Sequence, residues 1–302
     1  MQTCDVLIIG AGIAGSSLAW RLARGGQAVL LLERESQPGM HSTGRSAAMF
    51  MESYGPPGVR ALTRASRDFY LHPPPGFADQ PLLAPRAALF VATTEQHASL
   101  AAMQAELEAT GTQLSLLNKE QLALVAPALK PDLFDQALLD VHGYDIDVNA
   151  MLQGFLRGAR QAGARLLTGA VPTEGTRTGD AWRVTLSNGD VVQARTVVDA
   201  SGAWADEVAT LFGAAPIGLE PRRRSAFTFR APEGVDVSNW PMVADVDEGW
   251  YIKVDAGQLL GSPANADPVE PHDVQPEELD IAMGIHAIQE ATTLEIRRPT
   301  AT

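Results

Sequence analysis

Residues 5–15 read Asp-Val-Leu-Ile-Ile-Gly-Ala-Gly-Ile-Ala-Gly, and this stretch decides the fold. The apolar run at 6–9 is typical of a parallel strand that is buried on both faces. Gly10, Gly12 and Gly15 follow in the spacing G-x-G-x-x-G. The first glycine permits a tight turn, the second lets a pyrophosphate approach the backbone, and the third lets a helix pack against the strand.

The residues after this loop indicate what it binds. A helix is predicted over 13–24, and Ile13 and Ala14 lie in its first turn, where unpaired N–H groups and the positive end of the helix dipole attract phosphate. A second apolar run ends in Glu33, 21 residues after Gly12. An acid at this position accepts the ribose hydroxyls and repels a 2′-phosphate. We predict a dinucleotide site; the alternative, an ordinary strand–turn–helix corner, leaves Glu33 unexplained.

The segment 39–48 indicates which dinucleotide is bound. It reads Gly-Met-His-Ser-Thr-Gly-Arg-Ser-Ala-Ala, and its backbone N–H groups, hydroxyls and guanidinium can hold a second stretch of phosphate and ribityl chain. FAD is long enough to need this second cradle, so FAD is the expected cofactor. On composition alone, a solvated loop with a helix N-cap at Ser46 stays open. The expected cofactor contacts are Arg34, directly after Glu33, and the following residues of the segment: His41, Ser42, Thr43, Gly44, Arg45, Ser46, Ala47 and Ala48.

Composition indicates a globular protein and excludes several partners. With 302 residues, 45% of them hydrophobic, the chain is long enough for two domains. A formal charge of −13 disfavours nucleic acid and anionic membranes, and the basic cluster 222–224 is too short to change this. The single cysteine, Cys4, excludes an intramolecular disulfide and suits a packing role. No metal-ligand spacing, transmembrane segment or charged signal-peptide region is present, so a cytoplasmic protein is expected.

The predicted fold class is α/β, with a Rossmann-like FAD-binding domain and a second α+β substrate domain on a mainly antiparallel sheet. The FAD-binding domain is expected from 1–70 and 147–215, and the substrate domain from 71–146 and 216–302. Predicted helices cover 60–70, 100–109, 120–125, 148–161 with Asp147 as N-cap, and 276–290. Predicted strands cover 87–93, 182–186, 191–194, 196–200, 227–230, 242–245, 250–254 and 259–261.

Three further segments make the chain similar to a known family. Residues 221–227 read Pro-Arg-Arg-Arg-Ser-Ala-Phe, residues 261–268 read Gly-Ser-Pro-Ala-Asn-Ala-Asp-Pro, and 291–299 complete the match. With these segments and 39–48, the chain resembles the D-amino acid oxidase-like family of FAD-dependent oxidoreductases, and within it the bacterial D-arginine and D-amino acid dehydrogenases. The resemblance implies hydride transfer from the α-carbon of a D-amino acid to flavin N5. The imine then hydrolyses to a 2-oxo acid and ammonia.

The resemblance also implies the residues that touch the substrate. Tyr54 and Tyr251 match tyrosines that flank the substrate over the flavin, although by themselves they read as partly buried core tyrosines. Arg224 matches an arginine near the substrate, with a solvated or salt-bridged charge as the alternative. Met242 would form apolar wall. Two further cofactor contacts are implied, Val171 at the adenine, where a plain core valine is the alternative, and Gly202 in a Gly-Ala-Trp junction.

Two departures from the family pattern concern the substrate. Where the arginine-preferring relatives place a histidine and a glutamate, this chain has Met49 and Ala88. A buried substrate guanidinium would lack its counter-charge, so apolar or uncharged D-amino acids are expected in preference to D-arginine. Loss of the histidine leaves Tyr54, Tyr251 or solvent to manage the amine proton.

The family pattern continues beyond the Ile-Arg-Arg-Pro segment with a carboxylate-binding arginine and a glycine-rich loop, whereas this sequence stops at Thr302. A C-terminally truncated member with an unpaired apolar sheet edge is therefore expected. Three functions stay open: a working D-amino acid dehydrogenase or oxidase, a catalytically incompetent FAD- or nucleotide-binding remnant, and an NAD-dependent dehydrogenase, which leaves 39–48 unexplained. A small D-amino acid is the expected partner; the electron acceptor, FAD attachment and oligomeric state stay open.

Overall fold

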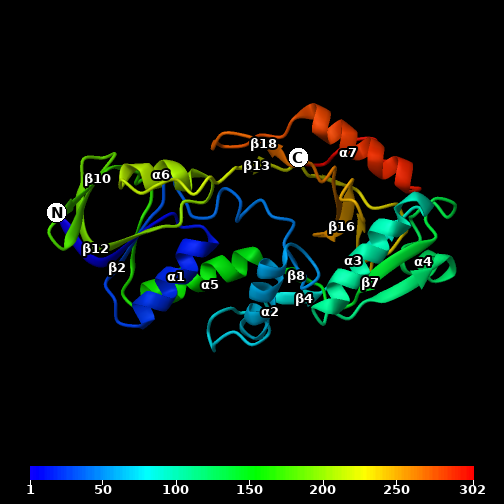
Figure 1. The fold of residues 1–302 in the computed structure, drawn as a ribbon, viewed down its shortest axis with the longest axis horizontal. Helices are drawn as coiled ribbons and strands as arrows, with labels where there is room; N and C mark the ends of the chain where they lie inside the picture. The colour runs from blue at the N-terminus through cyan, green and yellow to red at the C-terminus, as the bar shows by residue number, and fades with distance from the viewer.

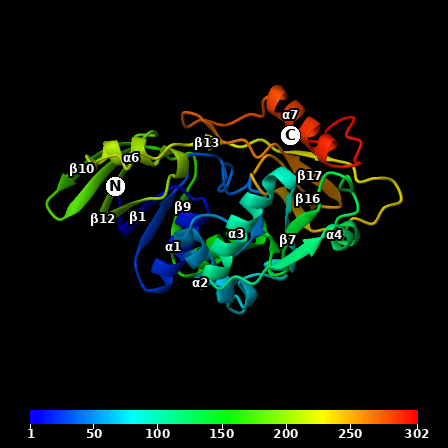
Figure 2. The same ribbon diagram turned by 45° about the vertical axis from the view of Figure 1, so that its right-hand side comes forward.

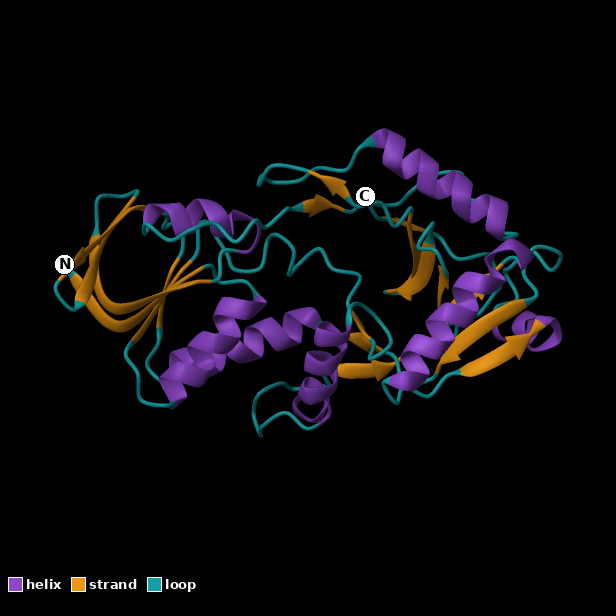
Figure 3. Ribbon diagram, viewed as in Figure 1, coloured by secondary structure: helices purple, strands orange, loops and turns teal.

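The computed structural model describes residues 1–302 and contains two large sheets at opposite ends of an elongated molecule (Figure 1). The N-terminal strand belongs to one sheet, and the C-terminus lies beside the other. The segment between β2 and β3, drawn in blue, runs from the first sheet towards the second. Figure 3 shows that most of this connection is loop rather than helix.

The first sheet is parallel at its centre and antiparallel on one side. β12, β1, β2 and β9 pair in parallel, and β11 and β10 add an antiparallel hairpin beside β12. In spatial order its strands are β10 (Pro172–Thr178), β11 (Ala181–Leu186), β12 (Val191–Asp199), β1 (Gln2–Ile9), β2 (Val29–Leu32) and β9 (Arg165–Leu167).

Burial on both faces explains the uninterrupted apolar run of β1. Val6 and Ile8 pack with α1 (Ile13–Arg24) and α5 (Val148–Gln161), while Leu7 and Ile9 pack on the opposite face with residues that include Val208 of α6 (Ala205–Leu211). Each buried aliphatic side chain contributes about 1.5–3 kcal/mol relative to an exposed one. The predicted α/β fold class with a Rossmann-like unit is confirmed.

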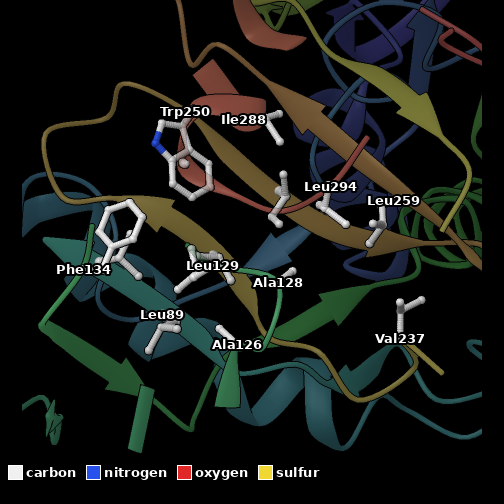
Figure 4. Packing of buried hydrophobic residues seen from close by; sticks show 14 of the residues in the cluster. Leu89, Ala126, Ala128, Leu129, Phe134, Val237, Trp250, Leu259, Ile288 and Leu294 are labelled. Carbon is white, nitrogen blue, oxygen red and sulfur yellow. The ribbon is translucent and has the colours of Figure 1, made fainter. Parts of the chain in front are cut away.

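The second sheet has seven strands and is antiparallel except for the pair β5–β15. α7 (Glu278–Ala291) covers one face, where Leu89, Leu259, Ile288 and Leu294 meet in one core (Figure 4). α7 lies over this sheet in both views, Figure 1 and Figure 2. Its strands in order are β14 (Phe227–Phe229), β17 (Gln258–Ser262), β16 (Tyr251–Asp255), β15 (Met242–Asp245), β5 (Ala88–Ala92), β7 (Gln136–Asp140) and β6 (Ser115–Asn118).

Smaller elements connect the two sheets. A three-stranded sheet and a two-stranded sheet join segments distant in sequence, and α2 and α3 contribute to the wall of the cavity described below. None of the helices has the length and apolar composition to cross a bilayer. These elements are β3 (Met49–Phe50), β8 (Tyr144–Ile146), β4 (Leu83–Pro85), β13 (Arg222–Arg223), β18 (Asp267–Pro268), α2 (Pro57–Leu71), α3 (His97–Ala109) and α4 (Lys119–Val125), with the short 3₁₀ turns η1 (Thr94–Gln96) and η2 (Gly202–Trp204).

Several expectations need correction. Residues 191–194 and 196–200 form one strand, β12, because its whole length pairs with β1 while only its first half also pairs with β11. α7 starts at Glu278 with Glu277 as N-cap, so Pro276 precedes the helix. No helix follows Ser46, which leads into β3. The strands of the first large sheet lie in the ranges predicted for the FAD-binding domain, and those of the second large sheet lie in the ranges predicted for the substrate domain. The division into two domains stays a prediction.

Candidate active site

A cavity opens at the carboxyl ends of β1 and β2, where a doubly covered parallel sheet places its ligands. It brings together four separate parts of the sequence, which are the glycine loop, the end of β2 with the segment 39–43, residues 170–172, and η2 with the residues next to it. Of the predicted cofactor residues, it is lined by Gly10, Gly12, Glu33, Arg34, His41, Ser42, Thr43, Val171 and Gly202.

The glycines of the loop serve different purposes. Gly10 has φ +101°, and a Cβ there would lie 2.3 Å from the carbonyl oxygen of Ala200. A Cβ on Gly15 would lie 1.9 Å from the carbonyl oxygen of Gly10. At Gly12 a Cβ would meet only the Thr43 hydroxyl, at 3.2 Å. Gly12 therefore keeps cavity space open, whereas the other two are required by the protein's own packing.

The first turn of α1 is hydrogen-bonded to the segment 39–48. The Ile13 N–H donates to the Thr43 hydroxyl over 3.0 Å, which joins the glycine loop to the segment 39–48. The Gly44 N–H donates to the His41 carbonyl, and a Cβ on Gly44 would lie 2.4 Å from the Gly39 carbonyl oxygen. Gly44, like Ala14 and Gly15, does not line the cavity but shapes its wall.

Glu33 is buried at the edge of the cavity. One carboxylate oxygen accepts from the Ala11 N–H over 3.1 Å and the other from the Glu35 N–H over 3.0 Å. Each carboxylate oxygen can accept a second hydrogen bond, so the group can still receive ribose hydroxyls. The Arg34 guanidinium lies 4.3 Å from the centre of the Trp204 ring and braces the same wall.

Two predicted cofactor residues already have protein partners. The Val171 carbonyl accepts from the Ser187 N–H over 2.8 Å, and its N–H donates to the Ser187 hydroxyl over 3.4 Å. The Arg45 guanidinium contacts the Asp273 carboxylate at 2.5 Å and the Val274 carbonyl at 2.8 Å. Hydrogen bonding to Arg45 lowers the pKa of Asp273. Adenine contact by Val171 and phosphate contact by Arg45 stay predictions.

A second cavity, of about 870 Å³, lies on the side of the second sheet opposite α7. Residues 45–49 line it, directly after the residues 39–43 that line the first cavity. One continuous loop therefore forms the wall of both cavities. This arrangement suits a ligand with a nucleotide at one end and a second ring system at the other, so the residues present fit FAD.

Most predicted substrate residues meet in this second cavity. Tyr54, Tyr251, Arg224, Met49 and Met242 all line it. The Arg224 guanidinium lies 3.7 Å from the Glu248 carboxylate and donates to the Ala264 carbonyl over 3.2 Å. Tyr54 is 45% exposed, which suits a position at the mouth. Ala88, by contrast, does not line the cavity and is buried beside Met242 in the core under it.

Burial raises the pKa of Tyr251 above its ordinary value of about 10. The phenol therefore stays protonated at neutral pH and can donate a hydrogen bond to a bound anion. A tyrosine in this state cannot serve as a general base near pH 7.

Sequence reasoning missed a buried cation, Lys253, that holds the segment 39–48. Lys253 is 3% exposed, and its Nζ donates to the Ala47 carbonyl over 2.8 Å. Nζ also lies 2.8 Å from Asp145 Oδ1, although the angle there falls outside hydrogen-bond geometry. The other Asp145 oxygen accepts from Arg86 Nε over 2.8 Å. Lys253 follows Tyr251 by two residues on β16, so period-two alternation was the available signal.

The backbone next to that contact is strained. Ala48 has φ +56°, which is uncommon for a residue other than glycine. Its carbonyl accepts from the Ile146 N–H over 2.7 Å. Lys253 and the end of β8 thus hold two consecutive carbonyls of the loop in a conformation that it would not adopt alone.

Comparisons with known proteins agree with this geometry. A family model described as "FAD dependent oxidoreductase" (DAO) matches residues 5–291. Dimethylglycine dehydrogenase of Mus musculus mitochondria is 24% identical over 277 residues, which cover 86% of this chain and 30% of that protein. The chain spans less than a third of the length of the curated relatives it matches first.

Solved structures share the fold over nearly the whole chain. L-α-glycerophosphate oxidase from Mycoplasma pneumoniae, solved with FAD bound, superposes with a TM-score of 0.86 at 19% identity and covers 99% of this chain and 81% of its own. Glycine oxidase from Geobacillus kaustophilus gives 0.80 at 20% identity, over 100% of this chain and 84% of its own. With the matched family model and a cavity pair that fits the cofactor, the chain belongs to the DAO family of FAD-dependent oxidoreductases, and its cofactor is FAD.

Proposed function

We propose that the chain oxidises D-amino acids whose side chains are not cationic to imino acids, which hydrolyse to 2-oxo acids and ammonia. The observation that carries the proposal is the loop 39–49, which lines both the nucleotide cavity and the cavity that holds Tyr54, Tyr251 and Arg224. FAD, when bound, supplies the acceptor for the hydride that leaves the α-carbon. The protein's own part is to bind and orient the amine, to exclude water and to allow the amine proton to leave.

The cavity residues suit these tasks. Tyr251, buried and protonated, can donate to the substrate carboxylate, and Arg224 can pair with that carboxylate if it leaves Glu248. Met49 and Met242 form apolar walls that reduce water at the reacting carbon. Such positioning can supply several kcal/mol of the barrier reduction. The apolar walls at Met49 and Met242 offer a substrate guanidinium no counter-charge, which disfavours D-arginine.

The amine must lose its proton before its lone pair can form the carbon–nitrogen double bond. Tyr251 cannot accept this proton near pH 7, because burial keeps its phenol protonated. The remaining route is solvent, which reaches the mouth of the cavity beside the exposed Tyr54. We therefore infer that the substrate binds with a neutral amine or loses its proton to water at the mouth.

A second candidate is the oxidation of N-substituted glycines. It is favoured by the similarity to dimethylglycine dehydrogenase and by the fold shared with glycine oxidase. The same two tyrosines and apolar walls would serve a secondary or tertiary amine. A panel containing D-alanine, D-leucine, D-arginine, sarcosine and dimethylglycine separates the two candidates, because only the first requires chirality at the α-carbon.

The test is an anaerobic visible spectrum of the FAD-loaded protein before and after each amine is added. Bleaching of the flavin band by neutral D-amino acids, with little effect of L-enantiomers and D-arginine, is the expected result. A flavin band that no amine bleaches, or failure to bind FAD, contradicts the proposed oxidation and supports the catalytically incompetent FAD- or nucleotide-binding alternative. A cytoplasmic location remains our prediction, to be checked by cell fractionation.

A further inference from the structure

One wall of the second cavity contains a buried arginine that the proposed function does not use. Arg60 lies in the first turns of α2 and is 5% exposed, yet it lines the cavity together with Gly55 and Pro56 just before the helix. Its NH2 group contacts the Glu106 carboxylate of α3 at 2.5 Å. Nε has no hydrogen-bond partner. A guanidinium has five N–H donors, so most of its donor capacity is unused by the protein.

Two features leave the charge of Arg60 incompletely offset, although Glu106, Asp245, Asp247 and Glu248 also line the cavity. A cation near the N-terminus of a helix is disfavoured by the helix dipole, typically by about 0.3–1 kcal/mol, whereas an anion there is favoured. Glu106 is the charge partner, but its side chain is 58% exposed. Water screens such an exposed carboxylate and can receive it if it moves away. The buried guanidinium is thus only partly compensated.

The other two arginines that line the cavity each make two contacts with the protein, whereas Arg60 makes one. Arg45 contacts Asp273 and a backbone carbonyl, and Arg224 contacts Glu248 and the Ala264 carbonyl. Asp245 accepts from the Gln96 side chain and from two backbone N–H groups. Arg60 is therefore the lining cation whose donors are least used and whose side chain is most buried.

We propose that Arg60 binds a carboxylate at the far end of the substrate, so that the preferred amines carry an acidic side chain. This inference rests on the proposed function. It narrows the side chains that are not cationic to acidic ones, in place of the apolar or uncharged ones expected from Met49 and Ala88. The substrate carboxylate takes the fork geometry of the guanidinium in place of Glu106, which turns to solvent. A cavity of about 870 Å³ leaves room for such an extended side chain beside the second ring system of the cofactor.

Two substitutions with opposite expected signs test the assignment. Arg60→Met removes the cation but keeps the apolar stem, and should weaken glutarate binding at least tenfold. Glu106→Gln removes the competing carboxylate and should tighten glutarate binding threefold to tenfold. Binding is measured through the perturbation of the flavin visible spectrum in FAD-loaded protein, with butyrate as a matched monocarboxylate that should be unaffected. The kcat/KM ratio for D-glutamate against D-leucine should follow the same order.

A matched control lies one helical turn away. Arg64 pairs with Glu52 at 3.1 Å and does not line the cavity, so Arg64→Met should leave the glutarate-to-butyrate ratio unchanged. A purely structural Arg60–Glu106 pair predicts that both substitutions lower the melting temperature and that neither changes this ratio, which would overturn the inference. If Arg60→Met fails to fold, the tightening by Glu106→Gln is still required.

The outcomes separate this inference from the proposed function. If D-leucine bleaches the flavin and butyrate binds, but glutarate and D-glutamate show no preference, only the role of Arg60 fails. If neither butyrate nor any D-amino acid affects the wild-type flavin spectrum, the proposed function fails first. If D-arginine is preferred over D-glutamate, both the role of Arg60 and the expected exclusion of cationic side chains are wrong.

Discussion

Gly10 and Gly12 stand two residues apart in one motif, yet different constraints act on them. Gly10 occupies a left-handed conformation against the backbone of Ala200, so the protein itself requires it. Gly12 has room for a methyl group except where it would approach the Thr43 hydroxyl. The spacing in the sequence predicts both glycines, but only the structure shows which one the fold needs.

This difference gives opposite expectations for two alanine substitutions. Gly10→Ala should destabilise the protein by about 1–3 kcal/mol or more, through φ strain and the clash at 2.3 Å. Gly12→Ala should leave the melting temperature of the FAD-free protein nearly unchanged and weaken FAD binding at least tenfold. Calorimetry and fluorescence titration with FAD measure the two effects. Equal loss of stability in both variants would contradict the distinction.

The raised pKa of Tyr251 predicts the pH dependence of its contribution. A phenol that ionises only above its ordinary value of about 10 keeps its donor throughout the range pH 7–9.5. Tyr251→Phe should lower kcat/KM by about tenfold to a hundredfold, equivalent to a hydrogen bond to a charged group of about 1.5–3 kcal/mol. The ratio of wild type to variant should be the same at pH 7 and pH 9. A ratio that falls to one by pH 9 would mean that the phenol ionises early.

Two strands, β16 and β8, together hold the loop 45–49 in place. Lys253 of β16 and Asp145 of β8 form an ion pair under Ala47, and Arg86 extends it to the carbonyls of Ser238 and Trp240 at 2.8 and 2.6 Å. A buried ion pair is a weak source of stability by itself, but removing one partner strands the other charge. The pair's main consequence is the position of the loop 45–49.

Lys253→Met should therefore affect both stability and cofactor binding. Leaving Asp145 without its ammonium partner should cost about 3–5 kcal/mol, reduced to the extent that Arg86 compensates. FAD affinity should fall as well, because the Ala47 carbonyl loses its donor. Lys119→Met, at an exposed pair with Asp132, is the control and should change stability by less than about 1 kcal/mol. Normal FAD affinity in Lys253→Met would show that the loop is held by other contacts.

The elements differ in how far the sequence predicted them. α1 and α5 have the predicted bounds, because each has a clear apolar face and a cap, Gly12 or Asp147. The sequence did not predict β10, a largely exposed strand at the edge of its sheet, because exposed edge strands lack apolar alternation. Arg60 and Lys253 were missed for another reason. Their burial depends on partners 46 and 206 residues away. The alternation along β16 places Lys253 on the same face as Tyr251, but it does not reveal those partners.

At the scale of the whole molecule, FAD bound across the two cavities would link the two large sheets. The cofactor loop, the glycine turn and η2 meet at one end, and α2, β15 and β16 at the other. The sequence predicted the nucleotide end from its motif. Residues of the second cavity were predicted only through the family resemblance, because the lining of that cavity combines residues from 45 to 264.

Removal of FAD should consequently lower the melting temperature of the whole protein. Free FAD at a hundred times its Kd stabilises a single-site protein by about 2.7 kcal/mol, which corresponds to a shift of about 4 °C for a chain of 302 residues. The shift should grow with FAD concentration in the wild type and be much smaller in Gly12→Ala. A melting temperature independent of FAD would contradict the link.

The pairing of β1 with β12 has a consequence for synthesis of the chain. Gln2 lies beside Val192, so after β1 leaves the ribosome it has no partner on that side until almost two hundred residues have followed it. At about 5–20 residues per second this wait is roughly 10–40 s. During that time the apolar edge and both faces of Val6–Ile9 are available to chaperones or to other nascent chains. A slower stretch of translation before residue 191 would prolong this exposure, whereas rapid translation up to residue 199 would shorten it.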